Sequence, residues 1–207
     1  MDDHGLFRTG LRNLLEEQGV QVVGEADSGT EALRQVREFA PDVVVMDLNM
    51  PGISGVEATR QITMIAPLTR VLVLTISEQD EDVMDAILAG ACGYLLKDAS
   101  ISELMAGIGS AAVGESRVSP IIASKVLQLV RASGASKRDA DLIQSELSDR
   151  EIQVLKLIAN GQDNAMIAGE LHISPKTVKN HISNILMKLQ IENRIQAAVY
   201  AVRSGIV

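Results

Sequence analysis

The sequence places an aspartate directly after a short apolar segment, a position typical of ligand-binding carboxylates. Val43–Met46 is followed by Asp47, and Asp2 and Asp3 form an acidic pair near the start of the chain. Ligands of open α/β sheets bind where the strands end, so a parallel sheet would bring these carboxylates together. Converging carboxylates repel one another unless a cation joins them, and Mg²⁺ prefers oxygen ligands. We therefore expect a magnesium site at this edge.

Two further apolar segments also end in polar residues. Thr75 closes the segment Val71–Thr75, and Lys97 follows Tyr94–Leu96. A hydroxyl group and an ammonium group at the same edge can bind the oxygens of a phosphoryl group carried by Asp47. Taken singly, Thr75 is an ordinary strand residue and Lys97 an ordinary surface lysine. The matching chemistry at each segment end favours a phosphoryl-accepting site.

These side chains must be positioned by alternating strands and helices. Val20–Val23 and the three segments above have strand composition, and residues 30–39 show the apolar spacing of a helix. Ser28 with Glu31 and Ser100 with Glu103 have the spacing of capping boxes at helix starts. The alternation predicts an α/β domain, a doubly wound parallel sheet with helices on both faces.

One expected element does not precede the first helical pattern. Such a domain ordinarily begins with a strand, yet residues 6–15 already show helical spacing directly after Asp2, Asp3 and His4. We expect the first strand of the sheet to be missing from this sequence. Either translation starts upstream of Met1 or the chain lacks that strand.

The front of the chain resembles the receiver domain of two-component response regulators. The acidic pair, the Asp47-x-x-x-Pro-Gly segment, Thr75 and the Tyr94-x-x-Lys97 spacing carry the resemblance over residues 2–115. It implies a flavodoxin-like sheet of order 2-1-3-4-5 and phosphorylation of Asp47 by a sensor histidine kinase. It further implies specific roles: Asp3, Asp47 and the backbone carbonyl of Asn49 bind Mg²⁺, Asp2 acts through water, Thr75 and Tyr94 are switch residues, and Lys97 is the counter-charge.

The end of the chain has a purely helical pattern. Asn164–Leu171, a turn, and a helix from Pro175 to about Gln190 have the layout of a helix-turn-helix, and a last helix covers about Arg194–Ser204. The second helix has an apolar stripe formed by Val178, Ile182, Ile185, Leu186 and Leu189. Its opposite face carries polar residues near the amino end, where a recognition helix meets base edges: Lys176, Lys179, Asn180 and Ser183. A solvated face of a small bundle is the alternative interpretation.

This segment is similar to the LuxR-type DNA-binding domain over about residues 147–205. The segments Leu147–Glu151, Val154–Gly161 and Ile173–His181 carry the similarity. It implies that Lys176, Lys179 and Asn180 face the DNA groove, and that the phosphate backbone is approached by Asn164, Thr177, His181 and Lys188. His181 is alternatively a packed helix residue. Ala165 stands where the family often has a lysine, and the small apolar face of the last helix is expected to make dimer contacts.

Composition and charge support two domains with different partners. The 207 residues include two Phe, two Tyr, no Trp and one Cys, which argues against sugar clefts, base-stacking RNA platforms and disulfide frameworks. The net charge is −8, but residues 1–115 carry 19 acidic and 7 basic side chains, whereas residues 148–207 carry 5 and 7. We expect a receiver domain at 1–115, a linker helix and tether at 116–146, and a helix-turn-helix domain at 147–207, in a cytoplasmic protein.

Together, the two resemblances predict a transcription regulator of the NarL/FixJ type. We expect a non-enzymatic, Mg²⁺-dependent protein that a histidine kinase phosphorylates at Asp47 and that binds double-stranded DNA as a homodimer. One alternative is a DNA-binding regulator that works without phosphorylation and keeps a degenerate receiver. Another is an aspartyl phosphatase, but such enzymes typically need an acid two residues after the nucleophile, where Asn49 stands.

Overall fold

The computed structural model describes residues 1–77, 79–114, 117–118 and 146–207, which divide into two compact units, Met1–Ser119 and Pro120–Val207. The linker helix and tether expected at 116–146 lie almost wholly outside the described residues. Among the described helices, none combines the length and the apolar character needed to cross a membrane. Each unit is considered by itself.

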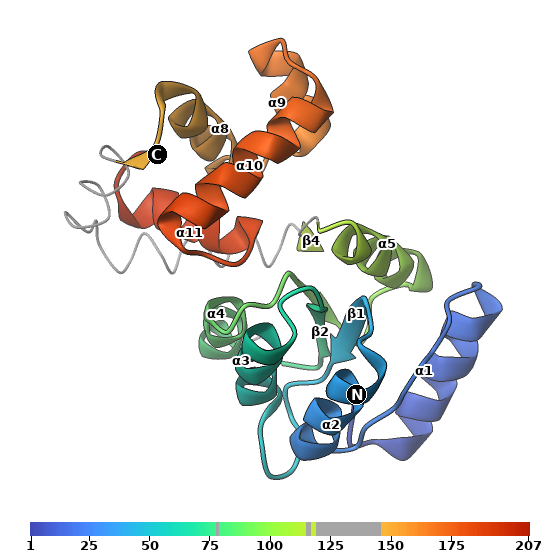
Figure 1. The fold of residues 1–207 in the computed structure, drawn as a ribbon. Coiled ribbons are helices and arrows are strands. Elements are labelled where there is room, and N and C mark those ends of the chain that lie inside the picture. The colour runs from blue at the N-terminus through green and yellow to red at the C-terminus, as the bar shows by residue number, and fades with distance from the viewer. Residues whose placement is uncertain (78, 115–116, 119–145) are drawn as a thin grey trace. The chain divides into compact units, whose positions relative to one another are not determined.

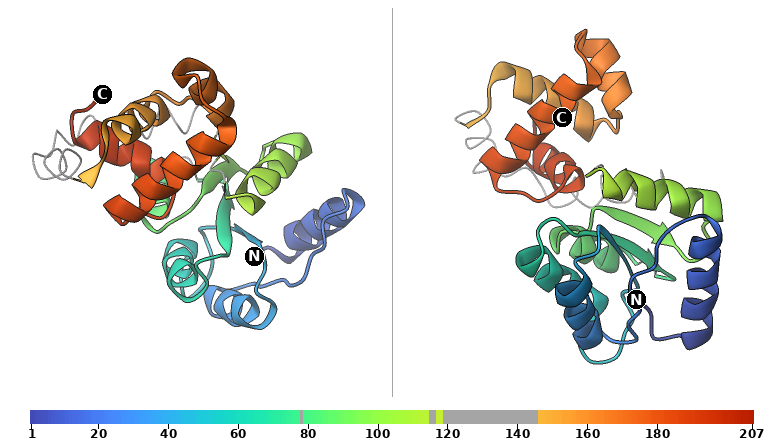
Figure 2. Two further views of the ribbon diagram at one scale, coloured as in Figure 1. Left: turned by 45° about the horizontal axis from the view of Figure 1, so that its top comes forward. Right: turned by 45° about the vertical axis from the view of Figure 1, so that its right-hand side comes forward.

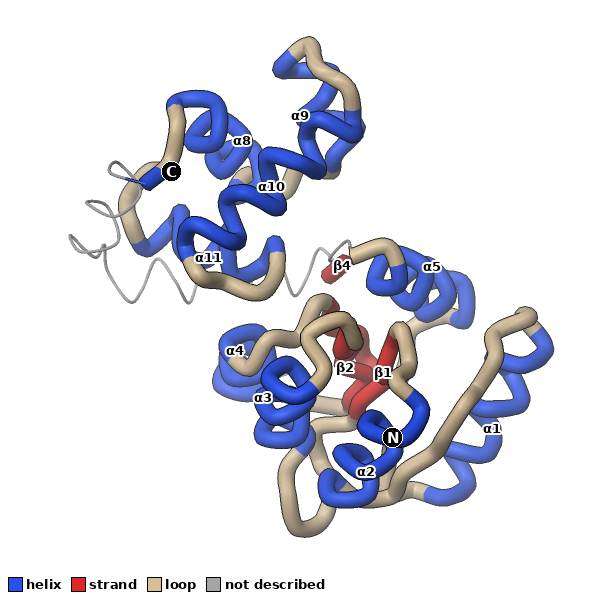
Figure 3. Tube along the Cα trace, viewed as in Figure 1, coloured by secondary structure: helices blue, strands red, loops and turns tan. Residues whose placement is uncertain are grey.

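The first unit is built on a parallel sheet. Its strands are β1 (Val43–Met46), β2 (Arg70–Thr75), β3 (Gly93–Leu96) and β4 (Arg117–Val118), and they pair in the order β1-β2-β3-β4 (Figures 1 and 3). Val44 is paired with Val71, and Val73 with Tyr94. The three strands expected after residue 40 are confirmed, while the short β4 was not predicted.

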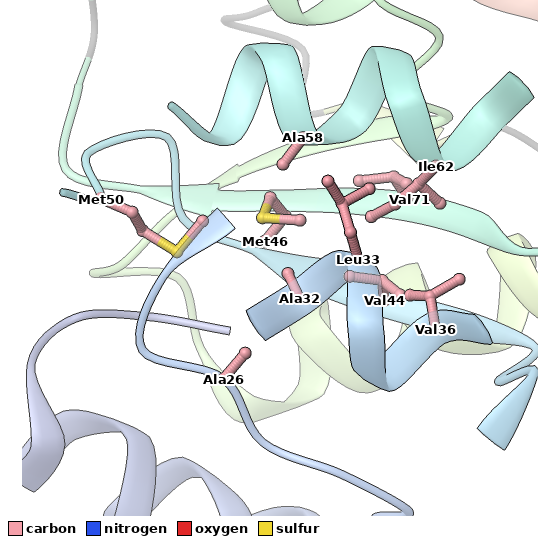
Figure 4. Close-up of a cluster of buried hydrophobic side chains, with 10 residues drawn as sticks. All are labelled: Ala26, Ala32, Leu33, Val36, Val44, Met46, Met50, Ala58, Ile62 and Val71. Atoms are coloured by element: carbon pink, nitrogen blue, oxygen red, sulfur yellow. The ribbon is translucent and has the colours of Figure 1, made fainter. Parts of the chain in front are cut away.

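Helices cover both faces of this sheet, which confirms the predicted fold class (Figures 1 and 2). The cluster in Figure 4 packs α2 (Gly29–Phe39) and α3 (Gly55–Ile65) against β1 and β2 through Leu33, Met46 and Ile62. A second cluster joins α1 (Gly5–Glu17) and α5 (Ile101–Ala112) to the other face through Leu15, Leu72, Leu95 and Leu104. The remaining helix of this unit among the described residues is α4 (Asp80–Leu88).

The strand predicted at Val20–Val23 is wrong. These residues lie in no β-ladder, because a strand there needs a central partner between itself and β1. A cavity of about 460 Å³ occupies that position, and its lining residues include Val20, Val22, Val43 and Val45. Met1 and Asp2 make strand-like hydrogen bonds here: Met1 N donates to Val45 O, Asp47 N to Met1 O, and Asp2 N to Ala26 O.

Two predicted capping boxes have different outcomes. At α5, Ser100 accepts a hydrogen bond from the backbone of Glu103, whose carboxylate accepts one from the backbone of Ser100, as predicted. At α2, Ser28 is the N-cap residue, but its side chain makes no cap hydrogen bond. The Glu31 carboxylate instead accepts hydrogen bonds from Arg34 and Gln35, which compete for the same oxygens.

The second unit is a bundle of four described helices. They are α8 (Asp149–Ala159), α9 (Asn164–Leu171), α10 (Pro175–Leu189) and α11 (Arg194–Arg203), and α9 with α10 forms the predicted helix-turn-helix. Within the predicted stripe of α10, Val178, Ile185 and Leu189 are buried, and Ile182 and Leu186 are half-buried.

The small apolar face of α11 is not an open surface. Ala197, Ala201 and Val202 are buried, and α11 packs mainly against α8. These three side chains complete the core of their own domain, whereas Ala198, the fourth small residue of this face, is half-buried. Dimer contacts through this face stay a prediction.

Candidate functional site

Asp47 lies directly after β1, at the carboxyl end of the sheet, and is only 2% exposed. The loop beyond it returns close to the strand: Gly55 N donates to Leu48 O. A Cβ atom at Gly55 would lie 2.0 Å from the carbonyl oxygen of Asp47, so this position requires glycine. The tight return holds the loop against the backbone of Asp47 and Leu48.

Lys97 joins two of the carboxylates. Its Nζ lies 2.7 Å from Asp47 Oδ2 and 2.8 Å from Asp2 Oδ2, and both carboxylate side chains are almost completely buried. Burial works against the charge of Lys97, but the hydrogen bonds to Asp2 and Asp47 raise its pKa. The ammonium group also lies 4.7 Å from the centre of the Phe7 ring on α1, a cation–π distance.

The acidic pair sits beside Asp47, as predicted. Ligand atoms of Asp2, Asp3, Asp47 and His4 all lie within 4.8 Å of one another. This set is mainly of carboxylate oxygens, so it fits the preference of Mg²⁺ for hard oxygen ligands. His4, which was not predicted as part of the site, contacts Asp3 through Nδ1 at 2.7 Å. The exposed Asn49 donates its backbone N–H toward Asp47 Oδ1 at 3.4 Å.

Thr75 and Tyr94 are both fully buried in the same sheet. Thr75 Oγ1 accepts a hydrogen bond from Ser77 N at 3.3 Å, and the Tyr94 hydroxyl donates to Ser77 O at 2.9 Å. Ser77, which the sequence offered no signal to single out, therefore connects the end of β2 with the tyrosine of β3. Its own hydroxyl group also donates to the carboxylate of Asp82 on α4.

The polar face of α10 is solvent-exposed. Its predicted reading residues are all exposed: Lys176, Lys179, Asn180 and Ser183. Thr177 lies within the N-terminal cap, where its backbone N–H donates to Ser174 Oγ at 3.0 Å, and His181 is half-buried. The helix thus presents several groups that can donate hydrogen bonds to base edges or phosphates.

Two residues predicted to approach phosphates have partners inside the domain. Arg194 Nη1 donates to Asn164 Oδ1 at 2.7 Å. Lys188 Nζ lies 2.8 Å from Glu151 Oε2 on α8. Neither contact had a signal in the sequence, because each joins helices that are far apart along the chain.

Both halves of the chain match known families. The model of the response regulator receiver domain matches residues 1–109, and that of the LuxR family of bacterial regulatory proteins matches residues 145–201. The chain belongs to the response regulators. This response regulator is 43% identical to the transcriptional regulatory protein LiaR of Bacillus subtilis (strain 168), over all of this chain and 97% of that protein. It is 39% identical to VraR of Staphylococcus aureus (strain Mu3), over 96% of that protein.

Solved structures lead to the same family. ChrA, a response regulator of a heme-sensing two-component system, is 35% identical over all of this chain and 96% of its own, with a TM-score of 0.52. RcsB, solved as two dimers bound to two parallel DNAs, is 26% identical over 98% of this chain and 95% of its own, with a TM-score of 0.57. This response regulator therefore combines a receiver domain with a LuxR-type DNA-binding domain and is a DNA-binding transcription regulator.

Proposed function

We propose that Asp47 accepts a phosphoryl group from a sensor histidine kinase and that this reaction controls DNA binding through α10. The bridge from Lys97 to Asp2 and Asp47 carries the proposal, because it brings the nucleophile, a cation and a further carboxylate into one buried cluster. The chain's likeness to LiaR and VraR supports it further. Mg²⁺ would be held by Asp2, Asp3, Asp47 and the carbonyl oxygen of Asn49.

The transfer itself needs positioning and charge more than covalent chemistry from the protein. An Asp47 carboxylate oxygen attacks the phosphorus, the phosphorus–nitrogen bond of the donor phosphohistidine breaks, and the released imidazole takes up a proton. Bound Mg²⁺ would supply positive charge to the phosphoryl oxygens. Lys97 exchanges its contact with Asp47 for one with the new phosphoryl group, and Thr75 offers its hydroxyl group to another oxygen.

A chain of hydrogen bonds would transmit the conformational change from Asp47 to the surface of the domain, through Thr75, Ser77 and Tyr94. When the Thr75 hydroxyl group turns toward the phosphoryl group, it gives up the hydrogen bond from Ser77 N. The Ser77 carbonyl that holds the Tyr94 hydroxyl group moves with it, and so does the link to α4 through Asp82. The population of receiver conformations then shifts toward one that favours homodimers.

DNA binding is assigned to α10 and its surroundings. We assign base contacts to Lys176, Lys179, Asn180 and Ser183, and phosphate contacts to Thr177, His181 and Asn164. Two copies in a dimer would read half-sites one helical turn apart, about 10 base pairs. The RcsB dimers bound to DNA support DNA binding as a dimer in a related chain.

The experiment is phosphorylation with acetyl phosphate and Mg²⁺, followed by intact-mass and peptide mass spectrometry. We expect one added phosphoryl group, located on Asp47, and none in the Asp47→Asn variant. A phosphoryl group on another aspartate, or none on the wild-type chain, would overturn the assignment. Equal DNA binding by wild-type and Asp47→Asn chains after treatment would support a regulator that works without phosphorylation.

A further inference from the structure

The last turn of α10 is joined to the start of α8 by one carboxylate oxygen. Glu151 Oε2 accepts hydrogen bonds from Ser148 N at 2.8 Å and from Ser148 Oγ at 2.9 Å, which completes the capping box of α8. The same oxygen lies 2.8 Å from Lys188 Nζ. A local cap is thereby extended into a contact between two helices.

This contact lies largely inside the domain. The Glu151 side chain is 5% exposed and that of Lys188 is 33% exposed. Burial opposes ionisation of Glu151, but the hydrogen bonds from Lys188 and Ser148 outweigh it, so the pKa of Glu151 lies below its ordinary value. The carboxylate is charged at neutral pH and needs its cation, because an unpaired buried charge is strongly destabilising.

Lys188 also points away from the face of α10 assigned to base contacts. At 3.6 residues per turn, Lys188 lies about 80° around the helix from Asn180 and about 120° from Lys176. It lies about 18 Å along the axis from Lys176. Asn180 and Lys176 are exposed, whereas the ammonium group of Lys188 is directed to α8.

The link adds a directional contact to the apolar packing of α10. Three buried apolar side chains pack α10 against its neighbours: Val178, Ile185 and Leu189. Apolar contacts of this kind have no preferred direction. A large rotation of α10 would expose this apolar stripe, whereas a small rotation about the helix axis would mainly lengthen the contact between Lys188 and Glu151. The ion pair therefore selects one rotation of the helix, and with it the direction of the exposed residues.

We propose that Lys188 is a positioning residue for DNA binding, which fixes the rotation of α10 by binding Glu151 and makes no contact with phosphate. The proposal rests on the assignment of α10 as the recognition helix and replaces the phosphate contact expected for Lys188. Its counterpart on α8 is Glu151, which acts through Lys188 and touches no DNA.

The salt dependence of binding separates the two roles. A lysine that neutralises a phosphate contributes about 0.9 to the slope of log affinity against log salt concentration, whereas a positioning residue contributes none. We would measure the affinity of the full chain for a fluorescent duplex, enriched from a random pool by the wild-type chain, between about 50 and 200 mM salt. The variants are Lys188→Met, Glu151→Gln and the double variant, with Lys176→Met as the matched lysine on the exposed face.

We expect Lys188→Met and Glu151→Gln each to weaken DNA binding about threefold to tenfold, with an unchanged slope of log affinity against log salt concentration. The double variant should bind DNA no more weakly than either single variant. Lys176→Met is expected to lower the slope. Glu151→Gln keeps the charge of Lys188, so it decides the question even if Lys188→Met fails to fold. A lower slope in Lys188→Met, or unimpaired binding in Glu151→Gln, would overturn the proposal. A wild-type chain that enriches no duplex would instead refute DNA binding itself.

Discussion

The proposed phosphoacceptor cluster and the proposed recognition helix are built in opposite ways. Asp2, Asp47 and Lys97 come from three separate segments and meet at the edge where the parallel strands end. The residues of α10 assigned to base contacts lie within eight consecutive positions of one helix, residues 176–183. The first site depends on charges that must remain paired in a buried place, whereas the second depends on the orientation of a single element. Substitutions in the first site should therefore mainly change stability, and substitutions in the second should mainly change DNA binding.

The largest effect on stability is expected from Lys97→Met. The change leaves the buried carboxylates of Asp2 and Asp47 without their cation, which should lower the free energy of unfolding of the receiver by about 3 kcal/mol. Urea unfolding without divalent cations measures it, and added Mg²⁺ should restore part of the loss. Lys156→Met, on the exposed face of α8, is the matched control and should change little. A decrease of less than about 1 kcal/mol in the free energy of unfolding of Lys97→Met would show that Lys97 does not stabilise the two carboxylates.

The cavity beside β1 is expected to give the second effect on stability. Four apolar β-branched residues attached before Met1 should extend the strand-like pairing of Met1 between Val43–Val45 and residues 20–25. Burying such side chains should raise the free energy of unfolding by about 3 kcal/mol after the cost of ordering them.

Amide hydrogen exchange would locate this effect at Val22 and Val43, which both line the cavity. An added segment of equal length made of Gly and Ser is the control and should give little protection. Equal stability of the two extended chains would show that the cavity does not accept a strand.

A smaller effect, on binding rather than stability, is expected from Asn180→Ala. Loss of a bidentate contact with adenine should weaken binding of the enriched duplex by about 1–3 kcal/mol and relax the preference at one base pair. Competition binding with single-base variants of the duplex measures both changes. Asn160→Ala, at the exposed C-cap of α8, should leave affinity and preference unchanged. Unaltered preference in Asn180→Ala would contradict the assignment of this residue to a base.

The smallest effect is a dependence of the helical domain on acid. The pKa of Glu151 is below its ordinary 4.5 in the folded chain, so the unfolded chain binds more protons as the pH falls. The stability that the pair contributes is present above about pH 4.5 and is lost progressively below it. Thermal unfolding across this range should show the loss in the wild-type chain and a flatter profile in Glu151→Gln. Identical profiles would show that the pair contributes nothing.

The two regions differ in how much of them the sequence could predict. The convergence of Asp2, Asp3, Asp47 and Lys97 was predicted, because the polarity of parallel strands alone brings segment ends together. The stripe and the exposed face of α10 followed from periodicity. The strand at Val20–Val23 was wrong because pairing depends on a central partner, which local composition does not report. Ser77 and the contact between Glu151 and Lys188 depend on packing between distant segments, so neither left a signal in the pattern of residues.

The most direct test of the account joins the two sites in one measurement. The affinity of the full chain for the enriched duplex would be measured before and after treatment with acetyl phosphate and Mg²⁺, with Asp47→Asn treated in parallel. We predict tighter binding by the wild-type chain after treatment, in proportion to the fraction phosphorylated on Asp47, and no change in the variant. Equal affinity of the phosphorylated and unphosphorylated wild-type chains would contradict control of DNA binding by Asp47.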